Sequence, residues 1–162
     1  MTAMVRRLTD GDIDAVVAVS LAAWAPVFAS CAAEMGDDVY GRVFPDWRAA
    51  QRQAVRDACE DPANEIWIAA IADDPVGFVA VRQTREGEAR AGEIYMIAVD
   101  PAHQRAGIGT LLLRHGIDEL RRAGVELLVI GTGGDPGHAP ARALYEDAGF
   151  APFRQVRYFR RP

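Results

Sequence analysis

The stretch that decides the fold runs from residue 93 to residue 110 and reads Glu93-Ile-Tyr-Met-Ile-Ala-Val-Asp-Pro-Ala-His-Gln-Arg-Ala-Gly-Ile-Gly-Thr110. Its first half is β-branched and aromatic, as in a strand, and Asp100-Pro101 ends that strand because proline lacks a ladder donor. Gly107 and Gly109 then lead into a helix. A helix start presents free N–H groups and a positive dipole end, so this turn predicts an anion site suited to phosphate. The alternative, that both glycines only permit a tight turn, stays open at this point.

The turn fits neither of two common phosphate-binding loops. A dinucleotide fingerprint needs Gly-x-Gly-x-x-Gly, and Leu112 stands where the third glycine would fall. A Walker lysine is also missing. The loop reads Gln104-Arg105-Ala106-Gly107-Ile108-Gly109, which resembles the Gln/Arg-x-x-Gly-x-Gly/Ala motif by which GNAT acetyltransferases hold the pyrophosphate of acetyl-CoA.

A second segment, residues 141–150, reads Ala-Arg-Ala-Leu-Tyr-Glu-Asp-Ala-Gly-Phe. It is similar to the closing Ala-x-x-Leu-Tyr-Glu-x-x-Gly-Phe element of the same family, in the same order along the chain. The resemblance covers residues 93–150, with the earlier part matching in outline. It implies a GNAT-like α/β fold, with a central, mostly antiparallel sheet flanked by helices. It also implies transfer of an acetyl group from acetyl-CoA to a primary amine of a small molecule or peptide.

The resemblance also implies roles for individual residues. Glu93 is the expected general base, taking a proton from the amine directly or through water, and Tyr145 occupies the family's general-acid position beside the departing thiolate. The backbone N–H of Ile97 is the expected oxyanion donor, on a strand that should pair with the pantetheine arm. The residues expected to bind the cofactor are Ile97, Ala98, Val99, Gln104, Arg105, Ala106, Gly107, Ile108, Gly109, Thr110 and His138.

Three of these residues have simpler interpretations that stay open. Glu93 could be a solvated residue at a strand end, and Tyr145 a half-buried packing residue on an amphipathic helix. His138 stands where the family often has Asn, three residues before Ala141. A histidine there could donate to the cofactor or relay a proton near pH 7, or it could simply belong to the loop.

Hydrophobic periodicity and turn residues extend the prediction to the rest of the chain. The order is a strand, two helices, three strands, a helix, a strand, a helix and a last strand, with residues 27–44 left unassigned. The predicted strands are 5–8, 65–71, 76–82, 93–99, 126–130 and 156–159; the predicted helices run from 13 to the residue before Pro26, over 46–59, from the Gly109 turn to Gly124, and over 141–148.

Composition favours one cytoplasmic domain, residues 1–162. Half of the residues are hydrophobic, a quarter are charged, and the apolar stretches fall short of the ~20 residues that span a bilayer. A net charge of −5 argues against binding nucleic acid or an anionic membrane. Cys31 and Cys59 stand in unrelated contexts, which indicates packing residues, and no ligand spacing suggests a metal.

Several alternatives remain for the acceptor and the reaction. A sensor that binds acyl-CoA without turnover is one, and an acyltransferase that uses another acyl group or modifies a protein N-terminus or lysine is the second. Whether the chain forms a homodimer also stays open. Trp24, Phe28 and Trp47 are expected in the core, with the wall of the acceptor pocket as the alternative. The remaining polar residues considered, expected on solvated surface or in an acceptor loop, are Glu34, Asp37, Asp38, His103 and His115.

Overall fold

The computed structural model describes residues 2–162, so Met1, the first residue of the predicted single domain, lies outside the described residues. Within them one sheet of five strands has the order β1-β2-β3-β4-β5. Neighbours from β1 to β4 are antiparallel, and β5 runs parallel to β4. The predicted mixed, mostly antiparallel sheet is therefore confirmed. The strands are β1 (Met4–Arg7), β2 (Asn64–Ile71), β3 (Asp74–Glu86), β4 (Ala89–Val99) and β5 (Leu127–Ile130).

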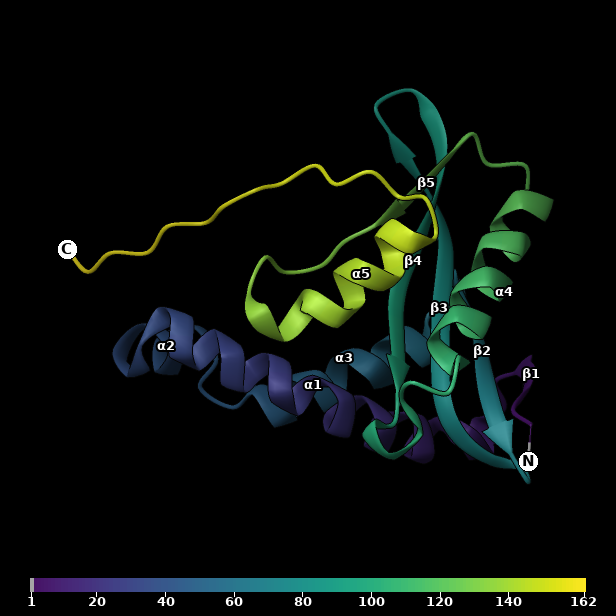
Figure 1. Ribbon diagram of the computed structural model, residues 1–162, viewed down its shortest axis with the longest axis horizontal. Coiled ribbons are helices and arrows are strands. Elements are labelled where there is room, and N and C mark those ends of the chain that lie inside the picture. The colour runs from purple at the N-terminus through teal and green to yellow at the C-terminus, as the bar shows by residue number, and fades with distance from the viewer. Residues whose placement is uncertain (1) are drawn as a thin grey trace.

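Helices cover both faces of this sheet, as Figure 1 shows. Apolar side chains of the first and third helices pack on one face, and those of the fourth and fifth pack on the other. This layering follows from the alternation within the strands, which sends successive side chains to opposite faces. The helices are α1 (Ile13–Met35), α2 (Asp37–Val43), α3 (Trp47–Glu60), α4 (Ile108–Arg122) and α5 (Ala139–Asp147).

The two faces of the sheet carry separate hydrophobic clusters. On the α1 and α3 face, Phe78 and Ile68 are almost completely buried beside Val16 of α1. On the opposite face, Leu112 and Leu113 of α4 are the most enclosed side chains of the helix. The central strands are apolar on both faces for this reason, which explains their continuous hydrophobic runs.

Glycines let α4 approach the sheet closely. A β-carbon at Gly92 of β4 would lie 2.7 Å from the Leu120 side chain, and one at Gly116 of α4 would lie 3.0 Å from that of Val81. Larger residues at either position would push the helix outward. The helix that carries the predicted phosphate turn is thereby held at a short distance from β4.

The first helix is longer than the sequence predicted. It passes through Pro26 and ends at Met35, where Gly36 takes a φ of 74°. Proline removes one helical hydrogen bond, to the carbonyl of Ala22, and both residues are exposed, so water can satisfy that carbonyl. The unassigned residues 27–44 therefore form the rest of α1 and all of α2.

The expectation that no apolar stretch reaches membrane-spanning length is also corrected by α1. The stretch Asp10–Met35 has 26 residues and contains an 18-residue segment with a mean hydropathy of 1.9, enough to cross a membrane by length and composition alone. In the fold it packs through Val16, Val17 and Val19, which are buried against the sheet. Of that apolar segment 22% is buried in the fold, and one such helix is weak evidence for a membrane span.

The predicted last strand, residues 156–159, does not form. Residues 150–162 have no helix or strand, and Figure 1 shows this tail running away from the sheet. Val156 and Tyr158 are 72% and 91% exposed. An alternating sequence becomes a strand only where a neighbour takes its ladder hydrogen bonds, and here the tail lies beside none.

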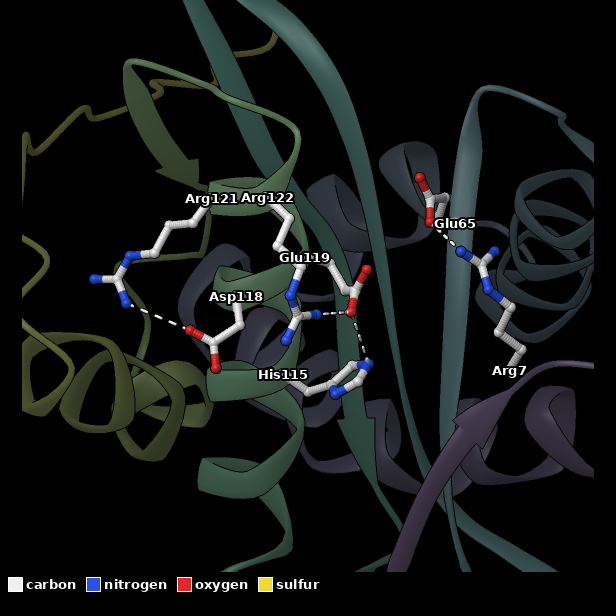
Figure 2. A network of polar contacts seen from close by, with 7 residues as sticks. All are labelled: Arg7, Glu65, His115, Asp118, Glu119, Arg121 and Arg122. Carbon is white, nitrogen blue, oxygen red and sulfur yellow. Dashed lines mark hydrogen bonds and ion pairs between the residues drawn. The ribbon is translucent and has the colours of Figure 1, made fainter.

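His115 is also less solvated than predicted. Its ring meets that of Trp67 edge to face, with 4.3 Å between the centroids. As Figure 2 shows, its Nε2 lies 3.7 Å from the Glu119 carboxylate, which is shared with Arg122. The rise of α4 over β2 places this histidine at the boundary between helix and sheet. Both cysteines are free and half-buried, consistent with packing roles.

Candidate functional site

The site begins where β4 and β5 stop pairing. The ladder between them has four pairs and ends at Ile94 with Ile130, whereas β4 stays paired with β3 as far as Val99. At Tyr95 the β3 register shifts, leaving this residue without an opposite partner, the sign of a β-bulge that bends the strand. From Tyr95 to Val99 one edge of β4 is therefore free of any strand among residues 2–162.

A cavity of about 790 Å³ lies beside this free edge. Strand β4 contributes one wall, the start of α4 and helix α5 contribute others, and α1 closes the remaining side. The volume lies within the range of pockets that hold drug-sized or cofactor-sized ligands. Among the predicted cofactor residues, those that line it are Ile97, Ala98, Val99, Gln104, Arg105, Gly107, Gly109, Thr110 and His138.

The remaining two predicted cofactor residues do not line this cavity. Ala106 is an exposed loop residue, and the side chain of Ile108 is buried in the core between α4 and the sheet. Both border a smaller cavity of about 310 Å³ near the N-terminus. Their contribution to a ligand at the larger cavity would thus come from the backbone.

The loop before α4 presents unpaired backbone donors to the cavity. Arg105 and Gly107 both have left-handed backbones, with φ of 63° and 80°, and Gly107 is the N-cap of α4. The first helical bond runs from the Leu111 N–H to the Gly107 carbonyl at 2.9 Å. The N–H groups of Ile108, Gly109 and Thr110 therefore precede the helical ladder, and Gly107 offers no side chain to cap them. These donors, the dipole end and Arg105 together suit an anion.

Gln104 has a second role that the sequence did not reveal. Its side-chain amide donates to the Val99 carbonyl at 3.0 Å, closing the end of the free edge of β4. Asp100 in turn accepts from the Ala102 N–H at 2.7 Å and starts the turn. The loop is thus tied to the strand that precedes it.

Tyr145 faces the cavity from α5 and is otherwise enclosed. It is 8% exposed and packs in the cluster that includes α4. Burial raises the pKa of its hydroxyl to about 12, because the phenolate would lose its hydration. Tyr145 therefore both packs in the core and lines the cavity, and its hydroxyl stays protonated at neutral pH.

Glu93 lies apart from the residues that line the cavity. Its carboxylate accepts from the Arg82 guanidinium of β3 at 2.6 Å, and its side chain is 25% exposed. The same guanidinium lies over the Tyr95 ring, 3.9 Å from the centroid. Tyr95 lines the cavity, so the Arg82–Glu93 ion pair sits immediately behind one of its walls.

His138 lines the cavity from the N-terminus of α5, in the 3₁₀ turn Pro136–His138. Its Nδ1 is paired with the Asp135 carboxylate. Burial, the largest single influence, would raise the pKa of Asp135, but the hydrogen bonds with His138 and Ser30 and the charge of the imidazole together outweigh it and hold that pKa below its ordinary value. The loop is fixed from α1, because the Gly137 N–H donates to the Ser30 hydroxyl at 2.9 Å.

The sequence matches the model of the acetyltransferase (GNAT) family over residues 32–150. This chain belongs to the GNAT acetyltransferase family. A mycothiol acetyltransferase of Saccharomonospora viridis is 32% identical over 125 residues, which cover 69% of this chain and 40% of that protein. A ribosomal protein bS18-alanine N-acetyltransferase of Salmonella typhimurium is 43% identical over 79 residues, 49% of this chain and 50% of that protein. This chain therefore spans half or less of these curated relatives.

Solved structures share the fold with this GNAT chain. An aminoglycoside N-acetyltransferase determined in complex with CoA superposes with a TM-score of 0.66 at 12% identity, covering 98% of this chain and 94% of that one. At such identity the likeness shows the fold alone. The fold predicted from the two motifs is thereby confirmed.

The aromatic residues of the GNAT chain divide differently from the prediction. Trp24 of α1 lines the cavity and also packs against the core cluster beneath it. Phe28 and Trp47 stack with centroids 4.4 Å apart, and Phe44 meets Phe28 edge to face. These three rings join α1, α2 and α3 and do not line the cavity.

Four polar residues around the cavity were missed by the sequence reasoning. Asp135, Ser30 and Arg142 hold the loop between β5 and α5, with Arg142 donating to the carbonyls of Gly133 and Asp135 at 2.7 and 2.8 Å. Arg82 pairs with Glu93 across the strands. An Asp three residues before a His is a local signal that could have been noticed, but the other contacts depend on the fold. No group of three metal-ligating side chains gathers among the described residues.

Proposed function

We propose that this protein is an N-acetyltransferase that moves an acetyl group from acetyl-CoA to a primary amine of a small molecule or peptide. The observation that carries the proposal is the free edge of β4, which faces a cavity whose mouth holds the unpaired N–H groups before Leu111. An extended arm with amides can pair with a free strand edge, and a pyrophosphate suits the helix start. Acetyl-CoA carries both groups.

In this proposal the residues divide the work of acyl transfer. The helix start and Arg105 hold the pyrophosphate, while residues 97–99 pair with the pantetheine arm. The Ile97 N–H donates to the oxygen that becomes negative when the amine attacks. Tyr145 gives its proton to the departing thiolate, and its raised pKa keeps that proton available over the whole neutral range.

Glu93 is the proposed first base, acting through water. Water is needed as a bridge because the Arg82–Glu93 pair lies behind the Tyr95 wall of the cavity, so the carboxylate is not proposed to contact the amine directly. A carboxylate at this position attracts an ammonium group and removes its proton by way of an ordered water. The ion pair with Arg82 holds the carboxylate in one orientation.

A screen for thiol release tests the proposal. The protein is incubated with acetyl-CoA and one of a panel of amines, polyamines, aminoglycosides and peptides, and free CoA is measured. We expect at least one acceptor to give amine-dependent release, with the acetylated product visible by mass spectrometry. Binding of acetyl-CoA without thiol release for any acceptor would favour the sensor function instead.

Together with this activity we propose that the protein is located in the cytoplasm, since that is where acetyl-CoA is made available.

A further inference from the structure

The Asp135–His138 pair is a second proton-handling group at the same cavity. The Nδ1 of His138 is occupied by the Asp135 carboxylate, which leaves Nε2 as the free ring nitrogen. A β-carbon at Gly133 would clash with the imidazole, so the ring lies tightly against the loop backbone. With one nitrogen bonded and the ring held, His138 presents a lone pair from a fixed position on the cavity wall.

Three elements supply the polar and charged groups around the Asp135–His138 pair. The charged group nearest to the imidazole is the Asp135 carboxylate, whose side chain is only 12% exposed. From α1, the Ser30 hydroxyl bonds to the Gly137 N–H and to the Asp135 carboxylate. The pKa of the neighbouring Cys31 thiol is raised by burial and by Asp135 and Glu34, so this thiol stays neutral. From α5, the guanidinium of Arg142 donates hydrogen bonds to two backbone carbonyls. A proton on His138 is thus balanced by an adjacent carboxylate.

The chain places His138 and Tyr145 at the same helix. His138 is the last residue of the 3₁₀ turn and the N-cap of α5, and Tyr145 lies within α5. Both side chains line the same cavity. A tyrosine whose pKa is about 12 becomes a strong base once it has given up its proton. It must be reprotonated before the next cycle, and of the groups that line the same cavity near α5, His138 offers an imidazole and Asp147 a carboxylate.

We propose that His138, positioned by Asp135, carries the second proton of acyl transfer to Tyr145. The amine nitrogen, already deprotonated once through Glu93 and water, bonds to the thioester carbon and becomes positively charged. The Nε2 of His138 takes one proton from that nitrogen. The carbon–sulfur bond then breaks and the thiolate takes the Tyr145 proton. The imidazolium returns its proton through water to the tyrosinate, and Glu93 passes the first proton to solvent, leaving an amide, a CoA thiol and all three residues as they began.

The inference rests on the proposed function, and one experiment separates the two. Thiol release by the wild-type protein with its best acceptor tests the function itself. His138→Ala is then expected to lower turnover about 10²-fold, the usual contribution of a positioned proton-transfer group. Imidazole added to the buffer should restore part of this loss, because the vacated space opens to the cavity. His138→Asn, which keeps a hydrogen-bonding side chain at this position, should be equally slow and guards against misfolding.

A double-variant comparison tests whether His138 serves Tyr145. His138→Ala combined with Tyr145→Phe should lose less rate than the product of the two single losses, since groups in one proton chain are not additive. Imidazole should leave Tyr145→Phe unchanged. The acetyl-CoA-induced shift in melting temperature should persist in all variants.

Three results would overturn the inference while leaving the proposed function standing. They are unchanged turnover in both His138 variants, rate losses that multiply in the double variant, and failure of imidazole to rescue His138→Ala. A wild-type protein that releases no thiol with any amine would overturn the proposed function and the inference together.

Discussion

Replacing Gly107 with alanine tests the anion site without introducing charge. Gly107 has a φ of 80° and no protein atom within 4 Å of the place where a β-carbon would lie. Gly107→Ala should therefore cost only the left-handed backbone penalty, about 1–2 kcal/mol. For a chain of this length that corresponds to a melting temperature lower by roughly 2–8 °C.

The matched control lies at the other end of the same helix. Gly124 has a φ of 75°, and a β-carbon there would meet only the Arg90 side chain, at 3.9 Å. Gly124→Ala should destabilise the free protein by a similar amount. The two variants thus share the backbone cost but differ in their distance from the cavity, since only Gly107 lines it.

The stabilisation that acetyl-CoA adds should distinguish the two variants. At acetyl-CoA one hundred times its dissociation constant, the wild-type protein and Gly124→Ala should gain about 2.7 kcal/mol, or roughly 5–11 °C. Gly107 lines the cavity proposed for the pyrophosphate, so a β-carbon there is expected to hinder the approach of the ligand to the backbone. If it weakens binding a hundredfold, the same concentration adds only about 0.4 kcal/mol. Scanning fluorimetry with and without acetyl-CoA measures both effects. Equal ligand-induced shifts in the two alanine variants would refute the assignment of the anion site.

Three further predictions concern single groups. Tyr145→Phe should bind acetyl-CoA normally but release thiol about 10²-fold more slowly; because burial raises the Tyr145 pKa to about 12, wild-type stability should also fall by up to about 2.7 kcal/mol between pH 10 and 12, a loss that the variant lacks in denaturant titrations. The paired Arg6 guanidinium holds the pKa of Asp12 far below its usual range, so wild-type stability should drop as the pH falls below about 4, and urea titration of Asp12→Asn should show that drop largely gone. Gly92→Ala forces its β-carbon against Leu120 and should cost about 1–3 kcal/mol by the same titration; no change would mean that α4 shifts freely.

Much of the fold could be predicted because its signals are local. The turn before α4 is specified by Gly107, whose left-handed backbone few other residues adopt, and the strand before it by a β-branched run. The motif around Tyr145 likewise lies within one short helix. Such features depend on residues within a few positions of one another, and the structure confirms the elements that they predicted.

Other features depended on which segments meet in space. Helix α1 continues through Pro26 because that side faces water, and residues 156–159 stay extended because no strand lies beside them. The sequence alone predicted the opposite in both cases, since it shows propensity but not neighbours.

The candidate site divides along the same line. By itself the sequence determined the residues of the phosphate turn, the strand that leads into it and the position of Tyr145. Only the tertiary structure decided that β5 leaves β4 after Ile94, that Arg82 engages Glu93 and that Ser30 of α1 fixes the loop beside His138. These outcomes depend on strand register, on burial and on the packing of α1 and α5 around one cavity. They are long-range properties, because each contact is stable only when several distant segments are already in place.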